Sequence, residues 1–133
     1  MAVIRSRAAL SLQHESLAAA RVSEVLGIEP SESFEIGDPF ARGTRVRDHS
    51  HWALDSPAEG DLETQLRALL DRLLPLHTAL TELHRAGYRL TWTCYVEECG
   101  GDAAVMLGAA LLNDLGTLPV DLWLDSYADT PPE

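Results

Sequence analysis

The sequence contains no lysine, only ten arginines, and no arginine after Arg89. Against these stand 21 acidic residues, so the formal net charge of the 133-residue chain is −11. Charge-driven binding to nucleic acid or to an anionic membrane requires a surplus of positive groups. The composition therefore predicts that neither is a partner. Residues 91–133 carry no base, and their acidic residues are Glu97, Glu98, Asp102, Asp114, Asp121, Asp125, Asp129 and Glu133.

Cysteine is scarce, and long apolar runs are absent. The two cysteines, Cys94 and Cys99, are expected to be thiols in a reducing cytoplasm. No window approaches the roughly 20 apolar residues of a membrane span, since even the leucine-rich stretch 62–83 carries charges. Arg5 and Arg7 interrupt the apolar run that a signal peptide would need. We therefore expect a cytoplasmic protein with no membrane partner.

Motifs of known catalytic and phosphate-binding sites are also absent. The chain has no G-x-S-x-G, no S-x-x-K, no G-x-G-x-x-G and no Walker loop. A zinc site would require His49, His51, Cys94 and Cys99 to converge, but zinc ligands are usually paired at tighter spacing. Cys94 is moreover expected to point inward as a small apolar residue. The sequence thus favours a non-catalytic protein with no metal and no cofactor.

Alternation of apolar and polar residues is the clearest pattern that is present, and it predicts strands with one apolar face. The predicted strands cover residues 4–12, 51–55, 88–96, 103–107 and 120–127. In the second strand Trp52 and Leu54 share one face. In the last strand the inward residues are Val120, Leu122 and Leu124. A hairpin turn over residues 99–102 joins the third strand to the fourth.

Helical periodicity predicts three helices between these strands. Leucines at intervals of four and three indicate a long helix that is capped by Asp61, divided at Pro75 and ended by Gly87. A short helix capped by Ser16 ends at Gly27, and another covers residues 108–115. Residues 28–50 show no sustained period and are expected to form a long loop.

This element order, β-α-β-α-β-β-α-β, predicts a single α+β domain over residues 1–133, frayed at residues 1–3 and 129–133. We expect a mainly antiparallel sheet of four to five strands with helices packed on one face.

The other face of the predicted sheet has no helix to cover it. Its outward positions combine aromatic and arginine side chains with carboxylates, which is typical of protein interfaces. These positions are Arg5, Arg7, Arg89, Thr91, Thr93, Tyr95, Asp121, Trp123, Asp125 and Tyr127. Three outcomes are open: the face binds a partner, it pairs with a second copy, or residues 28–50 fold over it. The candidate contact residues are Tyr95, Trp123 and Tyr127.

A second candidate site lies in the locally positive segment of the loop. Arg42, Arg45 and Arg47 can hold a phosphate or a carboxylate through bidentate hydrogen bonds. Together with Asp38 and Trp52 they would bind a small ligand between the loop 36–51 and the sheet. The alternative is that these arginines only balance nearby acids on the surface.

Three short segments carry a family resemblance. Val25-Leu-Gly-Ile-Glu-Pro30, Ile36-Gly-Asp-Pro39 and Trp52-Ala-Leu-Asp-Ser56 resemble the bacterial domain-of-unknown-function family numbered 4279. The resemblance runs from about Arg7 to Tyr127 and is weakest between Pro39 and His51. It implies an α+β domain without an established activity, so it assigns no catalytic residue. The matching positions are Gly37, Asp38, Trp52 and Ser56.

These observations lead to two hypotheses of different kinds. The first is a non-catalytic acidic interaction module that neutralises a basic protein partner, with charge complementarity speeding association, or that associates with itself. The second is a small-ligand-binding domain or an enzyme with its site between the loop 36–51 and the sheet. A pocket that holds the loop arginines beside Trp52 favours the second hypothesis. A flat aromatic and acidic face without a cavity favours the first.

Overall fold

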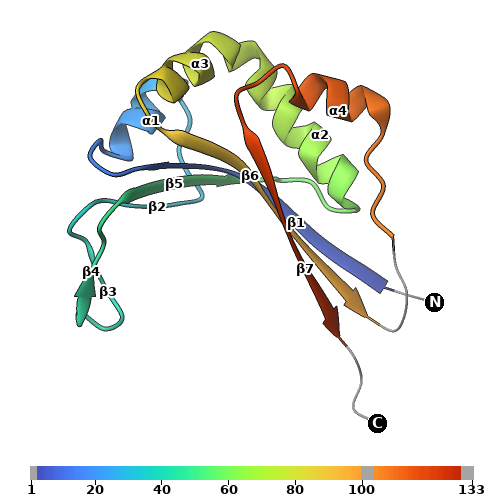
Figure 1. Cartoon of the computed structure of the whole chain (residues 1–133), viewed down its shortest axis with the longest axis horizontal. Coiled ribbons are helices and arrows are strands. Elements are labelled where there is room, and N and C mark those ends of the chain that lie inside the picture. The colour runs from blue at the N-terminus through green and yellow to red at the C-terminus, as the bar shows by residue number, and fades with distance from the viewer. Residues whose placement is uncertain (1–2, 100–103, 130–133) are drawn as a thin grey trace.

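The computed structural model describes residues 3–99 and 104–129, which form an α+β domain (Figure 1). Its main sheet has the order β2-β5-β1-β6-β7. The strands in that order are β2 (Glu32–Phe34), β5 (Ser50–Asp55), β1 (Val3–His14), β6 (Arg89–Cys99) and β7 (Asp121–Asp129). Every pairing is antiparallel except that of β6 with β7, which is parallel. The expected fold class, a mainly antiparallel sheet with helices, is confirmed.

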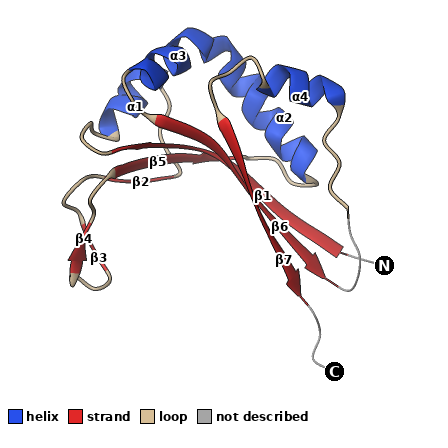
Figure 2. Cartoon of the chain, viewed as in Figure 1, coloured by secondary structure: helices blue, strands red, loops and turns tan. Residues whose placement is uncertain are grey.

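The helices gather on one face of this sheet and leave the other face open (Figure 2). They are α1 (Ala20–Leu26), α2 (Leu62–Leu73), α3 (His77–Arg85) and α4 (Ala109–Leu115), with the 3₁₀ turn η1 (Leu74–Leu76) between α2 and α3. None of the helices within the described ranges has the length and apolarity needed to cross a bilayer.

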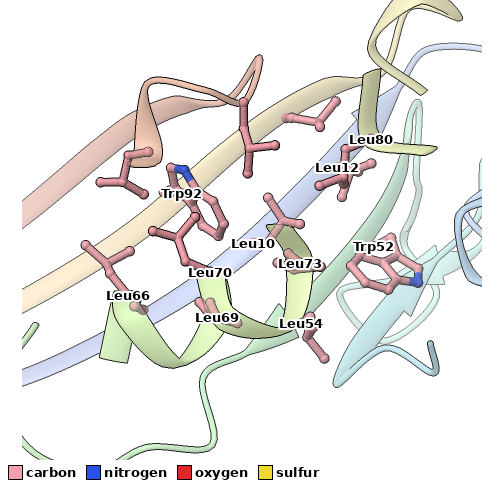
Figure 3. Close-up of a cluster of buried hydrophobic side chains, with 14 of the residues drawn as sticks. Leu10, Leu12, Trp52, Leu54, Leu66, Leu69, Leu70, Leu73, Leu80 and Trp92 are labelled. Carbon is pink, nitrogen blue, oxygen red and sulfur yellow. The ribbon is translucent and has the colours of Figure 1, made fainter. Parts of the chain in front are cut away.

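The alternation of side chains along the strands explains this one-sided arrangement. Leu10, Leu12, Trp52 and Trp92 come from three neighbouring strands and are buried on the helix side (Figure 3). The leucine stripe of the helical segment packs onto them. Its buried members are Leu62, Leu66, Leu69, Leu70, Leu73, Leu80 and Leu83. The core thus occupies the single layer between the helices and the sheet, as the alternation predicted.

The helical segment begins and divides where the sequence indicated. A carboxylate oxygen of Asp61 accepts the backbone N–H of Thr64 at 2.9 Å, so Asp61 is the N-cap of α2. Pro75 lies in η1, which separates α2 from α3 because proline lacks the N–H of an α-helical bond.

The predicted cap of the first helix, Ser16, is wrong. The helix α1 begins only at Ala20, and Ser16 instead donates its backbone N–H to the His14 ring at 2.9 Å. The carboxylate of Glu35 accepts the N–H groups of Ala19 and Ala20 at 2.6 and 3.0 Å. A side chain distant in the sequence therefore satisfies the helix start, and it also ties the segment after β2 to α1.

The predicted loop 28–50 contains more strand than expected. Besides β2, it forms a two-stranded ribbon of β3 (Pro39–Phe40) and β4 (Arg45–Val46). This ribbon stands beside the β2 end of the sheet (Figure 1). The segment therefore extends the sheet at its edge and does not fold over the open face.

The strand predicted over residues 103–107 is also wrong where it can be checked, because residues 104–107 have no strand structure. Residues 100–103 of the predicted hairpin lie outside the described residues. The chain passes from β6 to β7 through α4, a crossover that makes β7 parallel to β6. Val3 is the first residue of β1 and Asp129 is the last residue of β7, whereas both were expected to fray with the chain ends.

Replacing the buried Leu69 by alanine should lower the free energy of unfolding by about 2–5 kcal/mol, because it leaves a cavity in the layer between α2 and the sheet. Leu112→Ala on α4 is the matched control, since that side chain is 51% exposed. We expect the control to change stability by about 0.5 kcal/mol or less. Urea unfolding followed by circular dichroism measures both. Equal losses in the two variants would contradict the described core.

Candidate functional site

The strand register arranges the outward side chains of the open face in rows. One row contains Glu32, Ala53, Ser11, Thr91 and Asp121, from β2 across to β7. The next row contains Asp55, Ala9, Thr93 and Trp123. The third contains Arg7, Tyr95 and Asp125, and the fourth contains Arg5, Glu97 and Tyr127. Residues that are far apart in the sequence thus become neighbours on one surface.

A hollow of about 830 Å³ extends from this face to the loop after β5, where Ser56, Ala58 and Gly60 line it. Ala9, Ser11 and Ala53 lie at its floor. Charged and polar side chains surround this floor, namely Arg5, Arg7, Glu32, His51, Asp55, Thr93, Tyr95 and Asp125. The face is therefore concave and mixed in charge, whereas the sequence had suggested a flat surface or a pocket at the arginine loop.

The side chains of β7 on the open face alternate strictly between carboxylate and aromatic. We call the four residues Asp121, Trp123, Asp125 and Tyr127 the acid–aromatic row. Trp123 is 62% exposed and Tyr127 is 54% exposed. The Trp123 indole N–H donates to the Asp125 carboxylate at 2.9 Å, which holds that carboxylate beside the ring.

The third predicted aromatic, Tyr95, stands next to this row. Its ring centre lies 5.0 Å from that of Tyr127 in a tilted arrangement, and the side chain is half-buried. The register places Tyr95 between Arg7 on β1 and Asp125 on β7. The three predicted aromatics thus form one group with the carboxylates of β7.

The opposite face of β7 differs from the expectation. Leu122 and Leu124 do point to the helix side, but they are 42% and 47% exposed. Their register partners on β6, Trp92 and Cys94, are both buried. The helix layer covers β6 from Leu90 to Val96 and β7 only in part. The sequence period thus correctly gave the direction of these leucines and not their burial.

The second candidate site, at the arginine loop, is not assembled. Trp52 is fully buried in the core and donates its indole N–H to the Ser23 hydroxyl at 2.9 Å, so it offers no surface to a ligand. The Asp38 carboxylate accepts the Glu35 backbone N–H at 2.7 Å and stabilises the turn before β3. Arg42 and Arg45 are exposed in the β3–β4 ribbon, and neither lines the hollow.

Arg47, the third arginine of this loop, has a structural role. Its guanidinium carbon lies 4.1 Å from the centre of the Phe34 ring and 4.0 Å from that of Phe40. These cation–π contacts connect β2 to the base of the ribbon. The aromatic side chains of residues 28–50 are thus occupied locally, which explains why the segment leaves the open face uncovered.

The histidines and cysteine considered for a metal site have other partners. His49 contacts the Asp48 carboxylate at 2.7 Å, and His51 contacts that of Glu32 at 3.1 Å. Cys94 points into the core, and burial raises the pKa of its thiol to about 11. Among the residues that the structure describes, no three histidine, cysteine or acidic side chains are grouped as a metal ion would require.

The sequence did not indicate the floor of the hollow or three side chains of its rim, Glu32, His51 and Asp55. Ala9, Ser11 and Ala53 are outward positions by alternation, and their small size was the available signal. Only the register shows that they adjoin one another, because that depends on how two distant strands pair.

The Cys94 thiol should react slowly in the native protein, because its raised pKa leaves little thiolate at pH 8. A Cys99→Ser variant makes Cys94 the single thiol. We expect a thiol-specific disulfide reagent to label the folded variant at least about 100-fold more slowly than the urea-unfolded variant, as a pKa difference of about two units implies. Equal labelling rates would contradict the burial of Cys94.

Comparison with known proteins places the chain in a family. The family model described as a domain of unknown function (DUF4279) matches residues 4–129. Comparison with curated proteins and with solved structures gave no match. The match covers nearly the whole sheet and helix layer, in agreement with the resemblance of the short segments. The chain belongs to the DUF4279 family.

Proposed function

We propose that this chain is a non-catalytic interaction domain of the bacterial cytoplasm that binds an arginine-rich segment of a protein partner. The observation that carries the proposal is the exposed acid–aromatic row of β7, on the sheet face that none of the described helices covers. The two aromatic rings there are more than half exposed, and apolar patches rimmed by polar groups mark interaction sites on protein surfaces.

The chemistry of the row suits guanidinium groups. A guanidinium binds a carboxylate through two parallel hydrogen bonds and also stacks on an aromatic face. Trp123 and Asp125 offer both in one place, because the indole N–H fixes the carboxylate beside the ring. Asp121 and Asp125 are four residues apart on one strand face, so their carboxylates are spaced by about 13 Å. An extended basic segment can meet both acids at once.

The distribution of charge supports the same partner. No arginine follows Arg89, so the C-terminal third of the chain is uniformly acidic. Of the arginines on the open face, Arg5 and Arg7 lie on β1, which β6 separates from β7, and Arg89 lies at the first residue of β6. The negative electrostatic potential of these acidic residues raises the association rate of a basic partner, and added salt weakens this effect.

Binding of a small ligand is the second candidate, and the hollow is the observation that favours it. Arg7 stands at one part of its rim and Asp55 and Glu32 at another, so a ligand bearing both charges would be matched. This candidate replaces the site that was expected at the loop arginines.

The proposed function is tested with a seven-residue peptide of alternating arginine and valine. The double variant Asp121→Asn and Asp125→Asn should bind this peptide at least about tenfold more weakly than the wild-type chain, because it loses two charge-assisted contacts. Calorimetry gives the affinity. Tryptophan fluorescence gives the location, since Trp52 and Trp92 are buried and Trp123 is exposed.

A matched control neutralises two acids elsewhere. Glu24→Gln on α1 and Glu82→Gln on α3 change the net charge equally, and both side chains are exposed. We expect this control to bind within about threefold of the wild-type chain, as for charges distant from the contact. Absent binding by the wild-type chain, or equal weakening of both double variants, would refute the proposed site.

A further inference from the structure

We infer that the basic segment binds as an added β-strand along the free edge of β7; this inference rests on the proposed function. Among the described residues β7 pairs only with β6, so its other edge has no strand beside it (Figure 1). At the opposite side of the sheet the edge strand β2 has only three residues and is preceded by Pro30. A strand of three residues is a poor template for a further strand, whereas β7 has nine residues.

The register shows which backbone groups of β7 are available. Successive residues of a strand direct their N–H and C=O groups to opposite edges. The Ala8 carbonyl of β1 accepts the Ser56 amide at 2.8 Å on the β5 side, so odd-numbered residues of β1 face β6. The unbroken antiparallel register then directs the even-numbered residues of β6 toward β7.

In a parallel pair, a residue whose backbone groups face the neighbouring strand bonds to the two residues that flank its register partner. In β6 these are the even-numbered residues. The register partners of Trp92 and Cys94 are Leu122 and Leu124. The odd-numbered residues of β7 therefore face β6. The backbone groups of Leu122, Leu124 and Ser126 point to the free edge, where an incoming strand can use them.

Both faces of β7 are suited to the side chains of such a strand. An added strand alternates its side chains between the two faces of the sheet. Those on the open face would adjoin the acid–aromatic row, and those on the helix side would adjoin Leu122 and Leu124. The partial exposure of these leucines, 42% and 47%, is what a missing neighbouring strand would produce. The partner segment accordingly alternates basic and apolar residues.

A second copy of the chain fits this edge less well than a basic segment. It would bring the same Asp121 and Asp125 beside the first pair, and its own β7 carries no base. Like charges on neighbouring strands destabilise their pairing. The acids of β7 thus oppose self-association at the edge and favour a basic strand.

The edge is tested first with Ser126→Pro, compared with Ser126→Ala. Proline removes an N–H that faces the free edge and no hydrogen bond to β6, so the fold should be retained. We expect Ser126→Pro to bind the alternating arginine–valine peptide at least tenfold more weakly, and Ser126→Ala to bind it as the wild-type chain does. Unchanged binding by a folded Ser126→Pro variant would overturn the inference.

Two methylated peptides test it without altering the protein. One carries N-methyl groups on its three valine amides, and the other on three arginine amides. A strand directs only alternate amides to its neighbour, so one of the two should lose at least tenfold in affinity and the other should bind as the parent does. Loss with methylated valines indicates an antiparallel strand, and loss with methylated arginines a parallel one. Equal binding of the two peptides would overturn the inference.

The results also separate this inference from the proposed function. If the parent peptide binds and the aspartate variant weakens it, but both methylated peptides bind equally, the row binds arginine without strand addition. If the parent peptide does not bind, the proposed function fails as well. A stable dimer of the wild-type chain that Ser126→Pro dissociates would also overturn the inference, because the edge would then hold a second copy.

Discussion

The whole domain depends on one constraint, that the sheet buries only one of its faces. Alternation in β1, β5 and β6 places the large apolar side chains together on one side, among them Leu10, Trp52 and Trp92. The leucine stripe of α2 and α3 has the matching apolar surface, so the helices must lie on that side. Since burial of this surface is the main favourable term in folding, the polar face is left without a layer of its own.

The side chains of β7 alternate in the same way, but β7 lies at the edge of the sheet. It joins the sheet through a crossover that contains α4, and the helix layer covers it only in part. Its outward side chains are aromatic and acidic, and its free edge bears backbone groups that no described strand uses. The strand therefore combines the three elements of a recognition surface, which are charge of one sign, exposed rings and free hydrogen-bonding groups. The structural requirement that leaves the face open thus also provides the surface on which the proposed binding depends.

The parts of the molecule that sequence predicted well are those fixed by local periodicity. These include the strand alternation, the cap at Asp61, the division at Pro75 and the open face itself. The errors came where distant contacts decide. Glu35 replaces Ser16 as the cap of α1, and Trp52, which was also proposed as a ligand contact, is buried and hydrogen-bonded to Ser23. The hollow depends on the register of β1 with β5, and the exposure of Leu122 depends on how far the helices reach; neither is encoded in a local pattern.

The central claim is that a basic segment binds at β7 and the adjoining open face. The most direct measurement is a titration of the ¹⁵N-labelled chain with the alternating arginine–valine peptide, followed by amide shifts in NMR spectra. The account predicts that the largest shifts belong to β7 and to Tyr95 and its neighbours on β6, while the amides of the β3–β4 ribbon stay unchanged. Shifts centred on Arg42 and Arg45 of that ribbon, or no shifts at saturating peptide, would contradict it.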